Sequence, residues 1–223
     1  MKSGADATRP LDGMIVALIF EKPSLRTRGS FEVGVRQLGG DCVYFSPDDV
    51  GLGQREPVAD VARVLERWFD CVVARVFSHQ SIEMLAQHTS VPVVNALSDA
   101  EHPCQALADL LTIYEKKGAL EGKRIVYIGD GNNVAASLLL GAAMVGASFR
   151  FASPGGYRLP DSLMERAEEG EGAASYLRRE GLAGGRPLMI MHPGAGWETK
   201  RWEAGRYAVL GDAWLELSKG NLL

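Results

Sequence analysis

Hydroxyl and guanidinium side chains cluster in the stretch FEKPSLRTRGSFE, directly after the first hydrophobic run of the chain. Ser24 and Thr27 stand where a helix is expected to begin, and the backbone N–H groups there lack partners within the helix. The helix dipole favours negative charge at that end, and the forks of Arg26 and Arg28 suit phosphate oxygens. A capped surface helix with solvated arginines is the plainer alternative. The two hydroxyls and two arginines together favour an anion site.

A second polar group, HPCQ, stands at another expected junction between strand and helix. The His102 imidazole can donate a hydrogen bond to a carbonyl, and the Gln105 amide can donate and accept. This pairing suits a small planar group that carries C=O and NH₂. A loop or helix-capping role for His102 is the alternative. We expect Cys104 to be a packed small side chain rather than a nucleophile, because no base stands beside it in the sequence.

Arg75 interrupts the apolar run CVVARVF near its C-terminal end. In an open parallel sheet, ligands bind beyond the C-terminal ends of the strands, and a charge placed there has to be paired or to face a cleft. Arg75 stands near the C-terminal end of an expected strand, and the segments that carry Ser24 and His102 follow two others. We therefore expect them to meet at one edge of a sheet.

The motif GDGNNVA has some features of a dinucleotide fingerprint. It lacks the third glycine, and no acidic residue follows the next expected strand to bind a ribose. Nicotinamide binding is therefore not indicated. Asn132 and Asn133 offer amide donors and acceptors instead.

The bulk composition limits the class of protein. A chain of 223 residues allows one large or two small domains, and a net charge of −4 argues against non-specific nucleic-acid binding. The sequence contains no apolar run of about 18 residues, so no membrane span is predicted. The N-terminus lacks the apolar core of a secretory signal. The three cysteines have no CxxC spacing, so neither a disulfide framework nor a zinc site is indicated. We expect a cytoplasmic protein without a metal or organic cofactor.

Hydrophobic periodicity predicts alternating strands and helices, which indicates an α/β protein with a parallel sheet flanked by helices. In the first part, strands are expected at 14–20, 41–46, 71–77 and 92–97. Helices are expected at 25–38, 57–69 and 102–118, with a short one that starts near Ser78 or Ser81.

A second unit begins near Gly122, where a strand, a helix and a further strand form a βαβ pattern. A polar, glycine-rich stretch then indicates a linker, and a strand, a glycine loop and a final helix follow it. We predict four segments: a first domain at 1–120, a partial Rossmann-like domain at 121–169, a linker or seam at 170–186, and a strand-loop-helix fragment at 187–223.

Four motifs together resemble ornithine carbamoyltransferase over about residues 11–169: FEKPSLRTRGSFE, GLGQREPVADVARVL, HPCQALADLLTIYE and GDGNNVAASLLLGAA. The resemblance implies that the first domain binds carbamoyl phosphate and the second binds ornithine. It also implies a homotrimer formed through the first domain and a place in arginine biosynthesis. No nucleic acid and no membrane are implied as partners.

The resemblance also implies the site residues. Arg75 and His102 would be catalytic, and the substrate-binding residues would be Ser24, Leu25, Arg26, Thr27, Arg75, His102, Pro103, Cys104, Gln105 and Asn133. Ornithine's side-chain amine would attack the carbonyl of carbamoyl phosphate and give citrulline and phosphate.

Three departures from the family pattern affect this expectation. Leu25 replaces the first threonine of the S-T-R-T-R loop, so a hydroxyl contact is lost while a backbone N–H contact survives. Gly51 stands where many members carry a glutamine, and Gln54 is an uncertain substitute. The D-x-x-x-S-M and H-C-L-P motifs of the family's second half are not found, nor is its leading helix. We therefore expect impaired turnover.

The stretch HPGAGWETKRWEAGRYAVL resembles the start of the nucleotide-sugar domain of heptosyltransferase-like glycosyltransferases, over about residues 187–217. His192 and the loop 194–196 would meet a diphosphate, with Lys200 and Arg201 as its basic partners. The alternative is a strand-turn-helix with a purely structural role, whose basic residues are solvated. On this interpretation the chain joins two unrelated fragments near residues 170–186.

Three functions therefore remain in comparison. Carbamoyl transfer to ornithine, impaired by the missing motifs, is the main prediction. A non-catalytic module that binds carbamoyl phosphate or supports assembly is the first alternative. A nucleotide-sugar glycosyltransferase fragment is the second.

Overall fold

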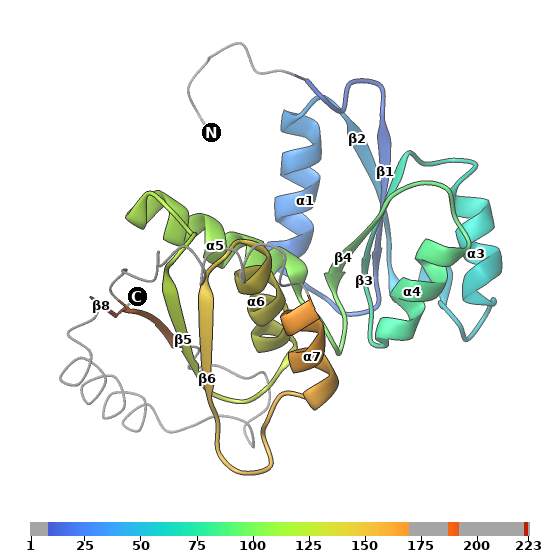
Figure 1. Ribbon diagram of the computed structural model, residues 1–223. Helices are drawn as coiled ribbons and strands as arrows, with labels where there is room; N and C mark the ends of the chain where they lie inside the picture. Colours follow the sequence, from blue (N-terminus) through green and yellow to red (C-terminus); the bar gives the residue numbers. More distant parts are fainter. Residues whose placement is uncertain (1–8, 170–186, 192–220, 223) are drawn as a thin grey trace. The chain divides into compact units, whose positions relative to one another are not determined.

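A computed structural model describes residues 9–169, 187–191 and 221–222 (Figure 1). The chain divides into two compact units, Met1–Cys104 and Gln105–Leu223. Each unit is built on its own sheet.

The described strands of the first unit form a four-stranded parallel sheet in the order β2-β1-β3-β4. The strands are β1 (Ile15–Phe20), β2 (Asp41–Phe45), β3 (Cys71–Arg75) and β4 (Val93–Leu97). The two central strands, β1 and β3, are almost fully buried. Both are short apolar runs without polar alternation, as expected for strands that are covered on both faces.

Helices cover both faces of this sheet (Figure 1). They are α1 (Leu25–Gln37), α2 (Pro47–Val50), α3 (Val58–Leu65) and α4 (His79–Gln87). Val16 and Leu18 of β1 share a core with Val35 of α1. Ala17 and Ile19, which point the other way along the same strand, share a core with α3 and α4.

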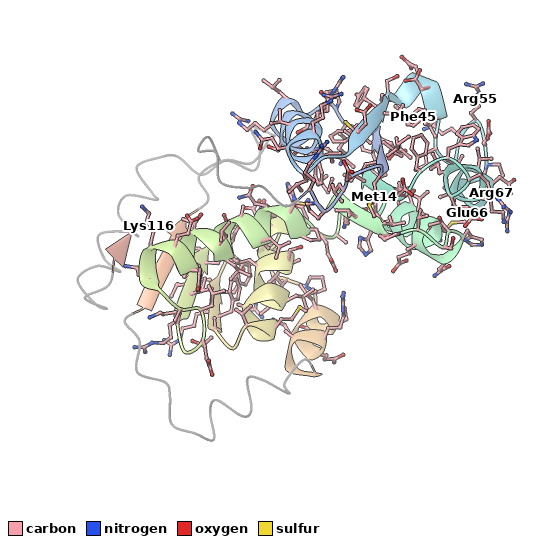
Figure 2. All side chains as sticks on the ribbon, turned by 90° about the horizontal axis from the view of Figure 1, so that it is seen from above. Met14, Phe45, Arg55, Glu66, Arg67 and Lys116 are labelled. Atoms are coloured by element: carbon pink, nitrogen blue, oxygen red, sulfur yellow. The ribbon has the colours of Figure 1, made fainter. Side chains whose placement is uncertain are left out.

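The third helix is shorter than its sequence pattern predicts. α3 ends at Leu65, and the chain turns before Trp68, which is 64% exposed. Glu66 and Arg67 lie on the outer surface of the unit at this turn (Figure 2). Glu66 accepts hydrogen bonds from the backbone N–H and the hydroxyl of Ser90, at 2.9 and 3.1 Å. This carboxylate therefore fixes the turn that leads into β4.

The second unit has a sheet in the order β6-β5-β7-β8, parallel throughout. Its elements are α5 (Pro103–Lys117, whose first two residues belong to the first unit), β5 (Arg124–Ile128), α6 (Asn133–Met144), β6 (Ser148–Ala152), α7 (Asp161–Glu169), β7 (Pro187–Met191) and β8 (Asn221–Leu222). Lys116 stands in the last turn of α5 (Figure 2). Leu110 and Ile113 of α5 pack with Tyr127 of β5 and Leu138 of α6 in one core.

The predicted fold class, an α/β protein with parallel sheets flanked by helices, is confirmed. The strand expected after residue 186 is present as β7, which pairs with β5. The predicted glycine loop and final helix fall within residues 192–220, outside the described residues. Among the described residues, no helix could span a membrane and no cluster of metal-ligating side chains occurs.

Candidate active site

The parallel register brings three strand ends of the first unit to one edge of its sheet. Phe20, the last residue of β1, pairs with Arg75, the last residue of β3, and Arg75 pairs with Leu97, the last residue of β4. The chain leaves β1 toward α1 and leaves β3 toward α4, which cover opposite faces. The two loops therefore diverge between β1 and β3, the position at which open α/β sheets bind ligands.

The first of these loops ends at the N-terminus of α1. Ser24 is its N-cap, with an extended backbone (φ −157°), and its Oγ accepts a hydrogen bond from the Thr27 N–H at 3.4 Å. The Ser24 hydroxyl donates to Thr27 Oγ1 at 2.9 Å. Leu25 begins the helix with its side chain 89% exposed, and Arg26 is exposed beside it. The helix start thus presents backbone N–H groups and a solvent-facing guanidinium.

Arg75 is half-buried at the end of β3. Its Nη1 donates to Thr27 Oγ1 at 3.5 Å, and its Nε is buried without a hydrogen-bond partner among the described residues. Burial lowers the pKa of this guanidinium. A buried donor without an acceptor is costly, so its presence at a strand end is typical of a group that meets a ligand.

His102 is half-buried in the loop between β4 and α5. Burial, and secondly the positive charge of Arg75, lowers the pKa of this imidazole from 6.5 to about 4. The ring is therefore neutral at physiological pH and carries one N–H donor. Ser24, Thr27, Arg75 and His102 all belong to the first unit, and contacts or charge interactions link Ser24 to Thr27, Thr27 to Arg75, and Arg75 to His102.

The rest of the HPCQ motif begins α5. Pro103 is the first helical residue, where its missing N–H costs nothing. The Cys104 thiol is half-buried and donates to the Asn95 carbonyl at 3.5 Å, and burial raises its pKa, as expected for a packed, unreactive thiol. Gln105 belongs to the second unit, where its amide donates to Asp109 Oδ1 at 2.9 Å.

The two asparagines of GDGNN differ in what they do. Asn132 is the N-cap of α6, and its Oδ1 accepts from the N–H groups of Val134 and Ala135 at 3.0 and 3.1 Å. Asn133 is the first residue of the helix and is half-buried. The amide oxygen of Asn132 thus caps the helix, a role that residue type alone did not predict.

The two arginines of the opening motif also differ. Arg28 forms an ion pair with Glu32 at 2.6 Å, and its guanidinium lies 3.5 Å from the ring centre of Tyr44. The hydrogen bond to Glu32 is the main cause that raises the pKa of Arg28. No such partner is recorded for Arg26 among the described residues. The free guanidinium of this helix turn is therefore that of Arg26.

Two residues of the same loop were not anticipated as part of the site. The Glu21 carboxylate accepts from the Phe77 N–H at 2.7 Å, and the Glu21 N–H donates to the Arg75 carbonyl at 2.8 Å. The Lys22 ammonium lies 4.5 Å from the ring centre of Phe77. These contacts tie the loop after β1 to the loop after β3. A carboxylate directly after a buried strand was the sequence signal for this role.

Gly51 occupies a backbone conformation that side chains rarely adopt. Its φ is +57°, and a Cβ added there would lie 2.8 Å from Arg55 Cβ. This geometry accounts locally for glycine at position 51. Gln54 is exposed, three residues further along.

Two family models match the chain. Residues 1–115 match the family described as "Aspartate/ornithine carbamoyltransferase, carbamoyl-P binding domain". Residues 121–178 match "Aspartate/ornithine carbamoyltransferase, Asp/Orn binding domain".

The chain belongs to the aspartate/ornithine carbamoyltransferase family.

Relatives and solved structures agree with this assignment. The chain is 54% identical over 170 residues to the ornithine carbamoyltransferase of Acidothermus cellulolyticus, covering 76% of this chain and 54% of that protein. It is 50% identical over 158 residues to that of Listeria monocytogenes, covering 71% and 50%. The chain thus spans about half the length of the curated relatives it matches.

The fold agrees as well. The structure of ornithine carbamoyltransferase from Pyrococcus furiosus superposes with a TM-score of 0.75 at 36% identity, covering 94% of this chain and 66% of that one. The enzyme from Thermus thermophilus gives 0.69 at 41% identity, covering 85% and 77%.

The heptosyltransferase-like resemblance is not supported. Neither family match reaches residues 187–217, and each relative named above is an ornithine carbamoyltransferase. Lys200, Arg201 and the glycine loop lie outside the described residues.

Proposed function

We propose that the first unit binds carbamoyl phosphate at the edge where β1, β3 and β4 end. The observation that carries this proposal is Arg75. Its Nε is buried without a hydrogen-bond partner in the part of the chain that the structure describes, and its Nη1 donates to Thr27 Oγ1 at the N-terminus of α1. A helix N-terminus suits a phosphate, and a half-buried guanidinium beside it suits the second charge or the carbonyl of the same molecule.

Each group has a distinct role in this proposal. The backbone N–H groups of α1 from Leu25 onward, the hydroxyls of Ser24 and Thr27, and the guanidinium of Arg26 hold the phosphate. Arg75 and the neutral His102 donate to the carbonyl oxygen, on which negative charge grows when an amine attacks the carbon. A neutral imidazole suits this role, because beside Arg75 it donates without adding a second positive charge. Pro103 and Cys104 follow His102 in the same unit and are proposed with it as substrate contacts, and Gln105 stays a prediction from the family resemblance.

We propose that the reaction is carbamoyl transfer to the side-chain amine of ornithine, which yields citrulline and phosphate. The match of residues 121–178 to the Asp/Orn-binding domain supports a second substrate with an amino-acid end, and Asn133 is its proposed contact. In such a reaction, holding the two reactants in the correct orientation supplies much of the rate acceleration. A homotrimer, a role in arginine biosynthesis and a cytoplasmic location are proposed with this activity.

Calorimetric titration with carbamoyl phosphate tests the binding step. Arg26→Ala is expected to weaken binding about tenfold or more, because a charge-assisted contact to the phosphate is lost. Arg28→Ala is the matched control. It removes an arginine two positions away that already pairs with Glu32 and Tyr44, so the affinity is expected to stay within about twofold. Equal losses in both variants, or none in Arg26→Ala, would contradict the proposed site.

A citrulline assay with ornithine separates transfer from binding alone. Product formation that falls in Arg75→Met and His102→Asn supports catalysis by this edge of the sheet. Tight carbamoyl phosphate binding without citrulline would instead favour the non-catalytic binding module. A nucleotide diphosphate that stabilises the wild type but not Lys200→Ala in a melting assay would favour the glycosyltransferase alternative.

A further inference from the structure

We propose that Ser98 is a positioning residue for His102. Its buried hydroxyl is hydrogen-bonded to His79, at the start of α4, and fixes the loop that ends in His102. The proposal concerns residues outside the motif and rests on the proposed function of His102. It arises from the residues that connect β3 to α4 and β4 to α5, which the reaction itself does not use.

Ser98 directly follows β4, and its exposed fraction is 0%. Its backbone N–H donates to the Glu101 carbonyl at 2.9 Å, and its Oγ accepts from the Glu101 N–H at 3.1 Å. A single residue thus closes the turn that begins at Ser98 and ends at Glu101. His102 is the next residue, so the direction in which its side chain leaves the backbone depends on this turn.

The hydroxyl of Ser98 also contacts side chains on two other elements. Asn95 Nδ2 donates to it at 3.3 Å from β4, and Nδ1 of His79 lies 2.8 Å away. A hydroxyl has one hydrogen and two lone pairs. The hydroxyl accepts from Asn95 and from the Glu101 N–H, and the Glu101 carbonyl at 3.3 Å and His79 Nδ1 at 2.8 Å are its two possible acceptors. The His79 contact is the shortest of the four.

His79 is itself fixed from the other side. It is the first residue of α4, and its backbone N–H donates to the Asp99 carboxylate at 2.7 Å. The Asp99 N–H donates to the Phe77 carbonyl at 3.1 Å. Three hydrogen bonds thus clamp the loop after β3 to the loop after β4: ring to hydroxyl, amide to carboxylate, and amide to carbonyl. Phe77 is in turn bound by Glu21, so the clamp reaches the loop after β1.

The clamp explains how a half-buried imidazole keeps its place near Arg75 without relying on a ligand. Without the Ser98 hydroxyl, the turn loses two contacts at once: the hydrogen bond from the Glu101 N–H and the hydrogen bond with the His79 ring. The imidazole of His102 then gains access to water and moves relative to Arg75, so both causes that lower its pKa weaken.

The test compares Ser98→Ala with Ser98→Thr in the full chain. NMR titration of the His102 ring and calorimetric titration with carbamoyl phosphate are the two readouts. In Ser98→Ala, the pKa of His102 is expected to rise from about 4 toward 6.5, and the affinity to fall about tenfold. Ser98→Thr keeps the hydroxyl and is expected to restore both.

Ser90→Ala is the matched control. Ser90 also closes a turn with its hydroxyl and backbone, through Glu66, but it stands before β4 at the opposite edge of the sheet. This variant is expected to change neither the His102 titration nor the affinity. If Ser98→Ala does not fold, His79→Leu removes the same contact from the other partner and is expected to give the same two changes.

An unchanged His102 titration in Ser98→Ala or His79→Leu would overturn the positioning role. Failure of the proposed function has a different signature. In that case the wild type shows no carbamoyl phosphate binding, while the His102 titration still responds to Ser98→Ala.

Discussion

The guanidinium of Arg75 reaches the hydroxyl of Thr27 at 3.5 Å, although 48 residues separate them in the chain. This contact joins the end of β3 to the first turn of α1. The same hydroxyl accepts from Ser24 at 2.9 Å, so one threonine side chain connects the helix cap to the buried arginine. The N-terminus of α1 and the Arg75 guanidinium, which are proposed to bind the two ends of one ligand, are therefore held in place relative to each other without the ligand.

Thr27→Val removes this hydroxyl and keeps the shape of the side chain. Arg75 Nη1 and the Ser24 hydroxyl both lose a partner, so we expect carbamoyl phosphate affinity to fall about tenfold, as for the loss of one or two hydrogen bonds to charged groups. Thr27→Ser retains the hydroxyl and is expected to bind nearly as well as the wild type. Calorimetric titration measures both. Equal affinity in Thr27→Val and wild type would separate Thr27 from the site.

The depressed pKa of His102 predicts how stability responds to acid. The folded chain keeps this imidazole neutral down to about pH 4, whereas the unfolded chain binds a proton near pH 6.5. Between these values the unfolded state holds more protons, so the free energy of unfolding falls as the pH is lowered through this window. Denaturant titrations at several pH values check this. His102→Asn is expected to flatten the response, and an unchanged slope in that variant would assign it to other groups.

Arg75→Met distinguishes the two causes of that shift. Burial is the larger cause, and the charge of Arg75 the smaller. The pKa of His102 is therefore expected to rise in this variant but to stay below 6.5, as followed by NMR titration of the ring. A full return to 6.5 would mean that the charge, not burial, dominates.

Gly51→Gln restores the residue that many family members carry and is expected to destabilise this chain. The backbone at Gly51 has φ +57°, and the new Cβ meets Arg55 Cβ at 2.8 Å. We expect a loss of about 1–3 kcal/mol, measured as a lower melting temperature. Gly29→Ala is the control: it stands inside α1, where an added Cβ meets nothing within 4 Å, so it is expected to be neutral or stabilising. A Gly51→Gln variant as stable as wild type would show that the loop rearranges freely.

Asn132→Ala tests the division of labour within GDGNN. The variant removes the acceptor of two N–H groups at the start of α6, which costs about 1 kcal/mol. Asn132→Ser is expected to recover most of that loss, because serine caps helices well. Thermal unfolding of both variants provides the measurement. A loss of ornithine binding at unchanged stability would instead place Asn132 with Asn133 in substrate contact.

Most elements could be predicted because their patterns are local. The apolar runs that became β1 and β3 are buried on both faces, and glycine at Gly118, with φ +71°, follows the end of α5 as expected. α2 and α7 were missed, since α2 has only four residues and α7 follows a polar stretch. The premature end of α3 was missed as well, because Trp68 continues the helical spacing but lies past a turn.

The site was predictable as a set of strand ends but not as a set of contacts. Residue type alone does not separate Arg26 from Arg28, and the family resemblance named only Arg26. The ion pair of Arg28 with Glu32 is a physical difference between them that the sequence did not reveal. The clamp built from His79 and Ser98 was equally hidden. Its partners are 19 residues apart, and neither side chain stands out in the sequence.

The order β2-β1-β3-β4 has a consequence for how this unit is made. β1, the first described strand of this unit, becomes an inner strand, and its second neighbour, β3, is synthesised only after α1, β2, α2 and α3. The N-terminus of α1, Arg75 and His102 can therefore assemble only once translation has passed residue 102. Until β3 has been synthesised, one edge of β1 lacks its partner, and distant pairings of this kind slow folding and leave nascent chains open to aggregation.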